Sequence, residues 1–309
     1  MLTDKQAKMV ILDTTPVTST TTASVTVHKG WFEQKQLFQT WLESILSSKA
    51  LLKPKYISLL TTKEECMAYF HQAFTHNSVH NEQNYEWLEI MGDATVNKCI
   101  VYYISQRFPF LHTPLGVKII ARLKIKLVSR KCLAELAEKI GIPSFIYYSE
   151  PCHKNQLRSL YEDVFEAMLG AIEILIDRYV EFGAGYSVCF RFMKSMLDEM
   201  DISIKYEDLF DSVTRLKETF DFFKSTLWGS IKYEVHKHEE GVKVCVFQIC
   251  PSTHRKVLWR EMIGIHPEEM KQDLAESILQ ELQQKHGLSR PIPSFYQEMQ
   301  NKLDSMSMS

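Results

Sequence analysis

The sequence predicts a mainly α-helical protein: a large all-α domain followed by a small α+β domain with the element order α-β-β-β-α. Two observations support this prediction. From near Trp31 to about Met200, apolar residues recur at helical spacing without any long strand-like alternation. After residue 204 a helical stretch precedes three strand-like runs and a long final helix.

The first domain is predicted over residues 29–200. Residues 1–28 precede it and include the threonine-rich run Thr14 to Thr22, which can bury little apolar surface and is predicted to be disordered. Breaks are expected at Lys53-Pro54, between Pro109 and Pro114, and at Gly141-Ile142-Pro143. The candidate helices are 31–48, 62–75, 84–107, 115–126, 129–140, 157–178 and 183–200.

The second domain is predicted over residues 204–287. Its candidate elements are a helix at 211–223, strands at 231–235, 242–250 and 256–263, and a helix at 267–285. Pro267 stands in the first turn of that last helix, where proline is favoured. Residues 288–309 are expected to form a loose tail with one amphipathic piece at 295–303.

Composition limits the function classes. The net charge is −2, so a surface for nucleic acid has to be local. The seven cysteines are odd in number and form no Cys-x-x-Cys pair, which indicates neither a disulfide framework nor a zinc site. Free thiols fit an intracellular, most simply cytoplasmic, protein. No apolar run reaches transmembrane length and no signal-peptide core is present, so neither a membrane nor secretion is expected.

Two acidic pairs are the strongest chemical signal. Glu89 and Asp93 are spaced i,i+4, and Asp163 and Glu166 are spaced i,i+3, so each pair shares one helix face. Apolar residues crowd both pairs, and burying carboxylates among them is costly without compensating cations or hydrogen bonds. The alternative for either pair alone is a solvated helix face, since acids are seldom buried unpaired.

Glycines favour the buried interpretation. Gly92 precedes Asp93, and Gly170 follows Glu166 by four residues. Glycine within a helix costs roughly 1 kcal/mol relative to alanine, and close approach of two helix backbones would explain it. That approach would bring four oxygen ligands together, where hard divalent cations could bind. Such a set is typical of a two-metal phosphodiester hydrolase.

A basic segment lies between the acidic pairs. It places six cations within fourteen residues and contains no acid. A solvated helix face is one interpretation, and sequence-independent contact with RNA phosphates is the other. The six residues are Lys118, Arg122, Lys124, Lys126, Arg130 and Lys131.

Three segments in register resemble the motifs of the ribonuclease III family. Residues 73–78 (AFTHNS) and 86–94 (EWLEIMGDA) are similar to the family signature, and residues 159–172 (SLYEDVFEAMLGAI) to its second motif. Residues 121–129 (ARLKIKLVS) resemble the helix between them. The resemblance covers about residues 60–178. The departures are Trp87 for an arginine, Met91 for a leucine and Thr95 for an aliphatic residue.

The resemblance implies a helical endonuclease domain that forms a homodimer and cuts both strands of double-stranded RNA, leaving 5′-phosphate and 3′-hydroxyl ends. It implies Mg²⁺ as the cofactor, with Mn²⁺ as a substitute. Glu89, Asp93, Asp163 and Glu166 match the family's metal ligands, and Asp93 and Glu166 are the expected catalytic residues. Glu86 matches a supporting acid.

In the same family a double-stranded RNA-binding domain follows the nuclease domain, and residues 204–287 match its element order. Their charges match poorly, with twelve Lys and Arg against fourteen Asp and Glu. Weak RNA binding and a protein-contact role therefore both remain open for this domain. For the whole chain, two further alternatives are a non-catalytic RNA-binding or ribosome-associated protein and a helical di-iron protein. The di-iron class needs Glu-x-x-His motifs, which these positions lack.

Overall fold

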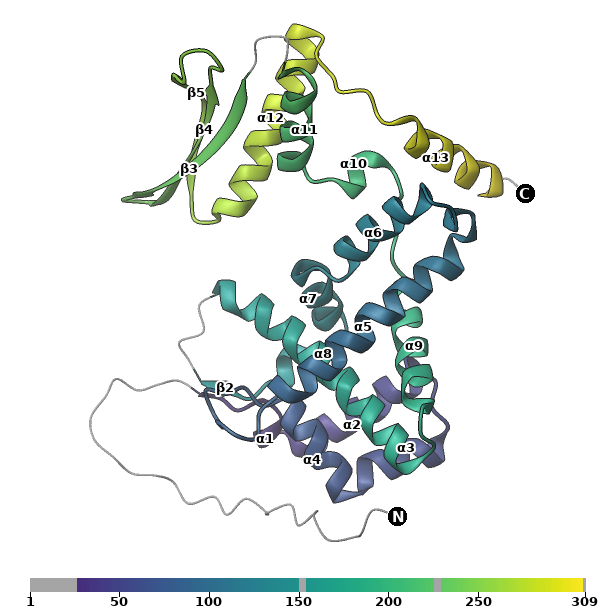
Figure 1. Cartoon of the computed structure of the whole chain (residues 1–309). Helices are drawn as coiled ribbons and strands as arrows, with labels where there is room; N and C mark the ends of the chain where they lie inside the picture. Colours follow the sequence, from purple (N-terminus) through teal and green to yellow (C-terminus); the bar gives the residue numbers. More distant parts are fainter. Residues whose placement is uncertain (1–26, 150–153, 225–228, 308–309) are drawn as a thin grey trace.

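The computed structural model describes residues 27–149, 154–224 and 229–307. A large helical domain forms one end of the molecule, and a smaller domain with three strands forms the other (Figure 1). The disorder predicted for residues 1–26 lies outside the described residues.

The helical domain contains the long helices that the apolar periodicity predicted. The exception is α3, which the sequence treated as a break because it begins with a proline. Pro54 occupies the first helical turn, where a missing N–H costs nothing. The helices are α1 (Gly30–Glu33), α2 (Lys35–Ser48), α3 (Pro54–Thr62), α4 (Glu64–Ala73), α5 (Glu86–Arg107), α6 (Gly116–Leu127), α7 (Arg130–Lys139), α8 (Lys154–Tyr179) and α9 (Ala184–Leu197), with the 3₁₀ turns η1 (Pro109–Leu111) and η2 (Ile142–Phe145).

Residues 27 and 28 are a correction to the predicted disordered segment. They form β1 (Val27–His28), which pairs antiparallel with β2 (Tyr148–Ser149). The His28 ring stacks on Tyr148 with centroids 4.9 Å apart, and its Nδ1 lies 2.6 Å from the carbonyl oxygen of Ile146. These long-range contacts cannot be read from local composition.

Helices α5 and α8 pack against each other at the centre of the helical domain (Figure 1). On α8, Val164 and Phe165 are fully buried, and on α5 so are Leu88 and Ile100. Each such side chain contributes about 1.5–3 kcal/mol when it leaves water. The two helices that carry the acidic pairs are therefore also the two that the core holds most firmly.

The second domain has the predicted order α-β-β-β-α. Its elements are α11 (Ser212–Phe222), β3 (Ser230–His238), β4 (Gly241–Ile249), β5 (Lys256–Gly264) and α12 (Pro267–His286). The strands form an antiparallel sheet in the order β3-β4-β5. Val244 and Val246 of the central strand pack with Leu216 of α11 and with Leu274 and Ile278 of α12, so both helices cover one face of the sheet (Figure 1).

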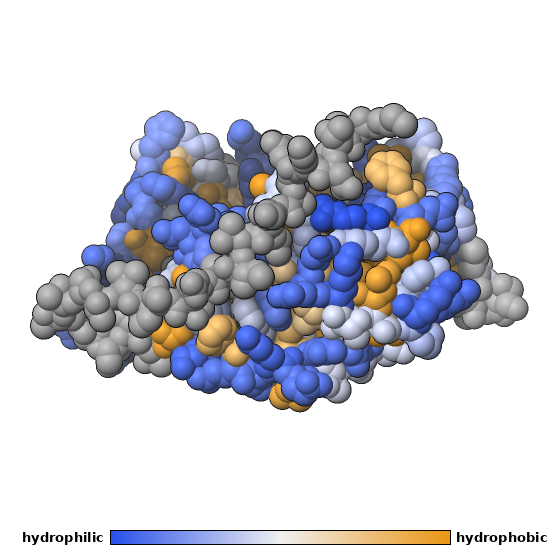
Figure 2. Space-filling view, turned by 90° about the horizontal axis from the view of Figure 1, so that it is seen from below, coloured by the Kyte–Doolittle hydropathy of each residue, from blue (hydrophilic) through white to orange (hydrophobic). Residues whose placement is uncertain are grey.

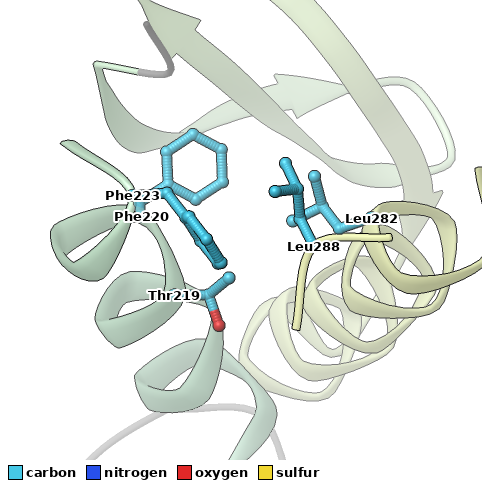
Figure 3. Close-up of a pocket in the computed structure, with 5 residues that line it drawn as sticks. All are labelled: Thr219, Phe220, Phe223, Leu282 and Leu288. Atoms are coloured by element: carbon cyan, nitrogen blue, oxygen red, sulfur yellow. The ribbon is translucent and has the colours of Figure 1, made fainter. Parts of the chain in front are cut away.

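A small cavity lies in this domain between α11 and α12. Phenyl rings from the α11 side face two leucines from the α12 side (Figure 3). The one polar side chain in its wall, Thr219, donates its hydroxyl to the carbonyl oxygen of Arg215 at 2.8 Å. The cavity is therefore a packing defect of the core and offers no chemistry. Its lining residues are Thr219, Phe220, Phe223, Leu282 and Leu288.

The C-terminal segment is more ordered than the loose tail that the sequence predicted. It forms the helix α13 (Ser294–Ser307), in which Tyr296 and Met299 are buried. Both side chains join the core of the helical domain, together with Tyr206 and Phe210 from the connector that contains the short helix α10 (Tyr206–Leu209). The amphipathic piece predicted at 295–303 thus packs across the domain boundary.

Within the described residues, no helix is both long enough and apolar enough to span a bilayer. Seen from below, the helical domain is mainly hydrophilic, with hydrophobic residues exposed singly or in small groups (Figure 2).

Candidate active site

Two glycines allow α5 and α8 to approach closely. A Cβ on Gly92 would lie 1.8 Å from the backbone oxygen of Glu166, and one on Gly170 would lie 2.2 Å from that of Leu88. No side chain larger than hydrogen fits at either position. The sequence argument that these glycines mark a close helix contact is therefore confirmed, and the contact sets the acidic residues of the two helices beside each other.

The four site carboxylates, Glu89, Asp93, Asp163 and Glu166, differ in exposure. Glu166 is 6% exposed, Glu89 and Asp163 are half-buried, and Asp93 faces solvent. The fifth predicted acid, Glu86, is exposed. The site thus runs from a buried end at Glu166 to an open end at Asp93.

Glu166 has the most perturbed carboxyl group of the site. Burial raises its pKa from 4.5 to about 9. Negative charge adds to this effect, from Asp93, Glu162, Glu89 and Asp163 in that order. The coupling to all three of the other site carboxylates means that the four groups share one electrostatic environment, as the sequence predicted from their spacing.

Two other site carboxyls are shifted in the same direction. Burial, followed by the charge of Asp163, raises the pKa of Glu89 to about 7. Burial also raises the pKa of Asp163, to about 6, while the hydroxyl of Tyr85 opposes this by donating to Asp163 Oδ2 at 3.0 Å. Perturbed acids of this kind cluster at functional sites.

Three neighbouring residues have roles that the sequence analysis missed. Tyr85 orients Asp163 across the helix pair, and Asn97 donates its side-chain amide to Asp93 Oδ1 at 2.6 Å. Glu162 adds negative charge to the site and pairs with Arg130 at 3.0 Å. Asn97 stands four residues after Asp93, so helical spacing could have revealed it, whereas the tyrosine contact joins distant segments.

Glu86 lies at the edge of the site. Its carboxylate accepts a hydrogen bond of 2.7 Å from the Asn77 amide, and its charge raises the pKa of Glu89. A supporting role fits this position better than that of a direct ligand.

The donor set fits divalent cations in charge and in atom type, since hard cations prefer several carboxylate oxygens. The ligand geometry is less complete than the sequence predicted. No three Asp, Glu, His or Cys side chains among the described residues stand close enough to surround an ion. Rotation of the side chains about their χ angles is therefore part of any cation binding here.

The six predicted RNA-binding cations differ in the contacts that they make. Three are held by other parts of the protein. The ammonium of Lys118 lies 5.4 Å from the centre of the Phe295 ring, and the guanidinium of Arg122 lies 4.4 Å from that of Phe210. Lys126 donates to the carbonyl oxygen of Asp208 at 2.9 Å.

The other three cations make different contacts. Arg130 pairs with Glu162, as described above. Lys131 is exposed and Lys124 half-buried, and within the described chain neither forms an ion pair. The sequence could not separate the two groups, because the partners of the first lie in the connector and in α13.

Cations of the second domain are largely paired within that domain. Lys271, near the start of α12, pairs with Glu268 of the same turn at 2.6 Å. Further pairs join Arg215 to Glu276, Lys243 to Glu261, Lys256 to Glu234 and Arg260 to Glu281. These pairs reduce the positive charge that this domain offers to a polyanion.

Comparison with known proteins shows which proteins this chain is similar to. A sequence model of a family described as Ribonuclease-III-like matches residues 68–195. A protein of Invertebrate iridescent virus 6, provisionally named ribonuclease 3, is 34% identical over 278 residues, covering 84% of this chain and 92% of that protein. A protein of Frog virus 3 (isolate Goorha) with the same provisional name is 39% identical over 195 residues, covering 62% of this chain and 51% of that protein. The solved nuclease domain of ribonuclease III from Campylobacter jejuni is similar at a TM-score of 0.37 and 21% identity, covering 51% of this chain and 97% of that domain.

Proposed function

Because the chain belongs to the ribonuclease III family and is an endoribonuclease, we propose that it hydrolyses double-stranded RNA with divalent cations bound by the four site carboxylates. The observation that supports this most directly is Glu166, an acid that is 6% exposed and whose pKa is raised by burial and by the charges of the three other site acids. A bound cation would stabilise the charged form of such an acid.

The reaction class follows from the ligands. Glu89, Asp93, Asp163 and Glu166 would hold Mg²⁺ or Mn²⁺, which when bound would supply water activation and neutralisation of the scissile phosphate, the chemistry that gives 5′-phosphate and 3′-hydroxyl ends. Within the protein, Glu166 and Glu89 supply negative charge at the buried end of the site. Asp93 supplies it at the open end, where the phosphate would enter, and Asn97 fixes the orientation of that carboxylate. Tyr85 holds Asp163 in its ionised form by donating a hydrogen bond to it.

Two copies of the chain are proposed to pair through α5. Trp87 and Ile90 are 57% and 65% exposed, and the exposed Ala94 and Val101 continue the same stripe at helical spacing. Large exposed apolar side chains gathered beside a site indicate an interface. Sedimentation of the wild type and of an Ile90→Asp variant tests this, since a dimer of this kind should dissociate in the variant and the monomer should remain folded.

The surface for RNA phosphates is proposed to include Lys124, Arg130 and Lys131. Each phosphate contact that is removed reduces the slope of log K against log salt by about 0.9 for a regular duplex. A Lys124→Ala, Lys131→Ala double variant should therefore flatten that slope by roughly 2. Lys302→Ala on α13 is the matched control and should leave the slope unchanged. An unchanged slope in the double variant would place the RNA surface elsewhere.

Cleavage itself is tested with purified protein and long double-stranded RNA, with Mg²⁺, with Mn²⁺ and with EDTA. We expect products only with a divalent cation. Glu166→Gln should bind the RNA and cut none of it, and Glu181→Gln in the exposed turn after α8 serves as the matched control. Cutting in EDTA, or Mg²⁺-dependent cutting by the Glu166 variant, would contradict the proposal.

An intracellular location is proposed from the thiols. The described cysteines are all free, and Cys66, Cys99, Cys132, Cys189 and Cys245 are buried. A reducing compartment keeps such thiols unpaired.

A further inference from the structure

Glu162 is a further acid on the helix face that carries Glu166. The two residues are spaced i,i+4 on α8, so their side chains lie one turn apart on the same face. After burial and the charge of Asp93, the charge of Glu162 contributes to the raised pKa of Glu166. In the described chain Glu162 differs from the four site carboxylates because it has a cationic partner, Arg130. The site therefore has a neighbouring acid that is already paired.

Arg130 reaches this face from another helix. It is the first residue of α7, and the Ser129 hydroxyl before it accepts a hydrogen bond from the backbone N–H of Cys132. That cap fixes where α7 begins, and α7 packs beside α8 (Figure 1). Arg130 Nε donates to Glu162 Oε2 at 3.0 Å. The pair thus joins the start of α7 to the acidic face of α8.

The ion pair uses only part of the guanidinium. Its Nε–H is bound to Glu162, and within the described residues neither terminal amino group makes a hydrogen bond. The side chain of Arg130 is 63% exposed, whereas that of Glu162 is 17% exposed. A guanidinium is a planar fork of donors that matches two oxygens of one phosphate. The donors that remain can therefore contact a phosphate from solvent while Nε stays bound to Glu162.

Arg130 also acts electrostatically on the site carboxylates. Burial raises the pKa of Asp163, and the Tyr85 hydroxyl and the guanidinium of Arg130 oppose this rise. A phosphate that approaches the site carboxylates meets like charge, and a cation at their edge offsets part of the repulsion. Of the six cations of the basic segment, Arg130 is the one that pairs with an acid of this region in the described chain.

We propose that Arg130 is a catalytic residue that contacts the reacting phosphate of the RNA, and that Glu162 is a positioning residue that holds the guanidinium beside the site carboxylates. In hydrolysis the hydroxyl of water bonds to phosphorus, the bond to the 3′ oxygen breaks, and the proton of the water goes to that oxygen. A donor that is already in place stabilises the charge that develops on the phosphate oxygens. This role rests on the proposed RNA-cleaving function and deepens it, because Lys124 and Lys131 would contribute to affinity and Arg130 to the rate.

The test measures kcat and KM of the full-length protein on long double-stranded RNA at a saturating Mg²⁺ concentration. Arg130→Ala removes the guanidinium, Glu162→Gln removes the charge that holds it, and a double variant combines the two changes. Lys139→Ala is the matched control, because Lys139 lies on the same helix and also pairs with a carboxylate, that of Glu199, at 2.6 Å. Arg130→Lys keeps the charge and loses the fork, and it serves as the milder variant if Arg130→Ala does not fold.

Arg130→Ala should lower kcat by about 10²–10³-fold, as for the loss of one preorganised donor, and should leave KM little changed. Glu162→Gln keeps the guanidinium but not its position, so kcat should fall by roughly 10–100-fold. The double variant should be no slower than Arg130→Ala, because Glu162 acts through Arg130. Free guanidinium at a non-denaturing concentration should restore part of the rate in Arg130→Ala, and Lys139→Ala should match wild type.

Several outcomes would overturn the assignment. An unchanged kcat in folded Arg130→Ala or Arg130→Lys excludes contact with the reacting phosphate. A raised KM with kcat unchanged places Arg130 on the binding surface alone. Losses that multiply in the double variant show that Glu162 does not act through Arg130. A lower melting temperature with no rescue by guanidinium makes the pair a structural link between two helices, although exposed ion pairs usually contribute little to stability.

Failure of the proposed function would look different. In that case wild type itself would not cut double-stranded RNA with Mg²⁺ or Mn²⁺. Normal cutting by wild type, together with unchanged kcat in the folded variants, refutes the role of Arg130 and leaves the proposed function intact.

Discussion

The Glu166→Gln variant tests the electrostatics of the site without any substrate. Its free energy of unfolding is compared with that of wild type at several pH values. Glutamine keeps the shape of the side chain and removes its charge. Because burial and the neighbouring acids raise the pKa of Glu166 to about 9, the folded chain binds this proton more tightly than the unfolded chain does. The free energy of unfolding that depends on Glu166 is therefore greatest below pH 4.5 and is lost as the pH rises toward 9.

The size of the effect follows from the shift. One pKa unit corresponds to about 1.4 kcal/mol, so wild type should lose stability relative to the variant by about 1.4 kcal/mol per pH unit over this range. The pKa values of Glu89 and Asp163 are lower, about 7 and about 6, so above about pH 8 Glu166 is the site acid that still changes its charge. From pH 7 to 8.5 the difference should amount to about 2 kcal/mol.

The assay is urea unfolding of both proteins at several pH values with EDTA present, and the quantity of interest is their difference. Taking a difference cancels groups shared by the two proteins, including Cys250, whose thiol has its pKa lowered to about 6 by hydrogen bonds from Ser252 and Thr253. Addition of Mg²⁺ at pH 8 should then stabilise wild type and leave the variant nearly unchanged. If the difference in free energy of unfolding between wild type and variant does not change with pH, Glu166 is not buried beside other negative charges as described.

The other predictions concern the helix contact and the tyrosine. Gly92→Ala should abolish cleavage and destabilise the fold by several kcal/mol, because its Cβ would overlap the backbone of Glu166. Gly287→Ala, which has open space around the new Cβ but a positive φ, should cost only about 1–2 kcal/mol and leave cleavage intact, as thermal melts and a gel assay would reveal. Tyr85→Phe removes the donor that lowers the pKa of Asp163, so the acid limb of the pH–rate profile should move to higher pH, and cleavage should fall more at pH 6 than at pH 8. An acid limb that does not move would show that the Tyr85 hydroxyl does not stabilise the ionised carboxylate.

Local patterns were sufficient for most of the secondary structure. Apolar spacing predicted α5 and α8, and alternation in one segment and valine content in the next predicted strands, because these patterns are properties of single segments. The pattern failed at α3, where Pro54 begins a helix and was interpreted as a break between helices.

The candidate site also has features that local sequence predicts and features that depend on distant segments. The spacing of each acidic pair placed its members on one helix face, and a glycine beside each pair predicted the close contact between the helices. The exposure of each acid, the hydrogen bond from Tyr85 to Asp163 and the absence of a closed ligand ring in the described chain all depend on distant segments. A residue's own neighbourhood in sequence does not specify them.

By itself the sequence determined which residues could do the chemistry: four acids at helical spacing, with small residues where two helix backbones must touch. The tertiary structure decided how their charges interact and which remote segments the cations of α6 contact. Lys118, Arg122 and Lys126 are indistinguishable in sequence from Lys124 and Lys131, yet it is the first three that contact the connector or α13 in the described part of the chain. The physical reason is that charge and hydrogen bonding act through space, so the function of a surface depends on which remote segments pack against it.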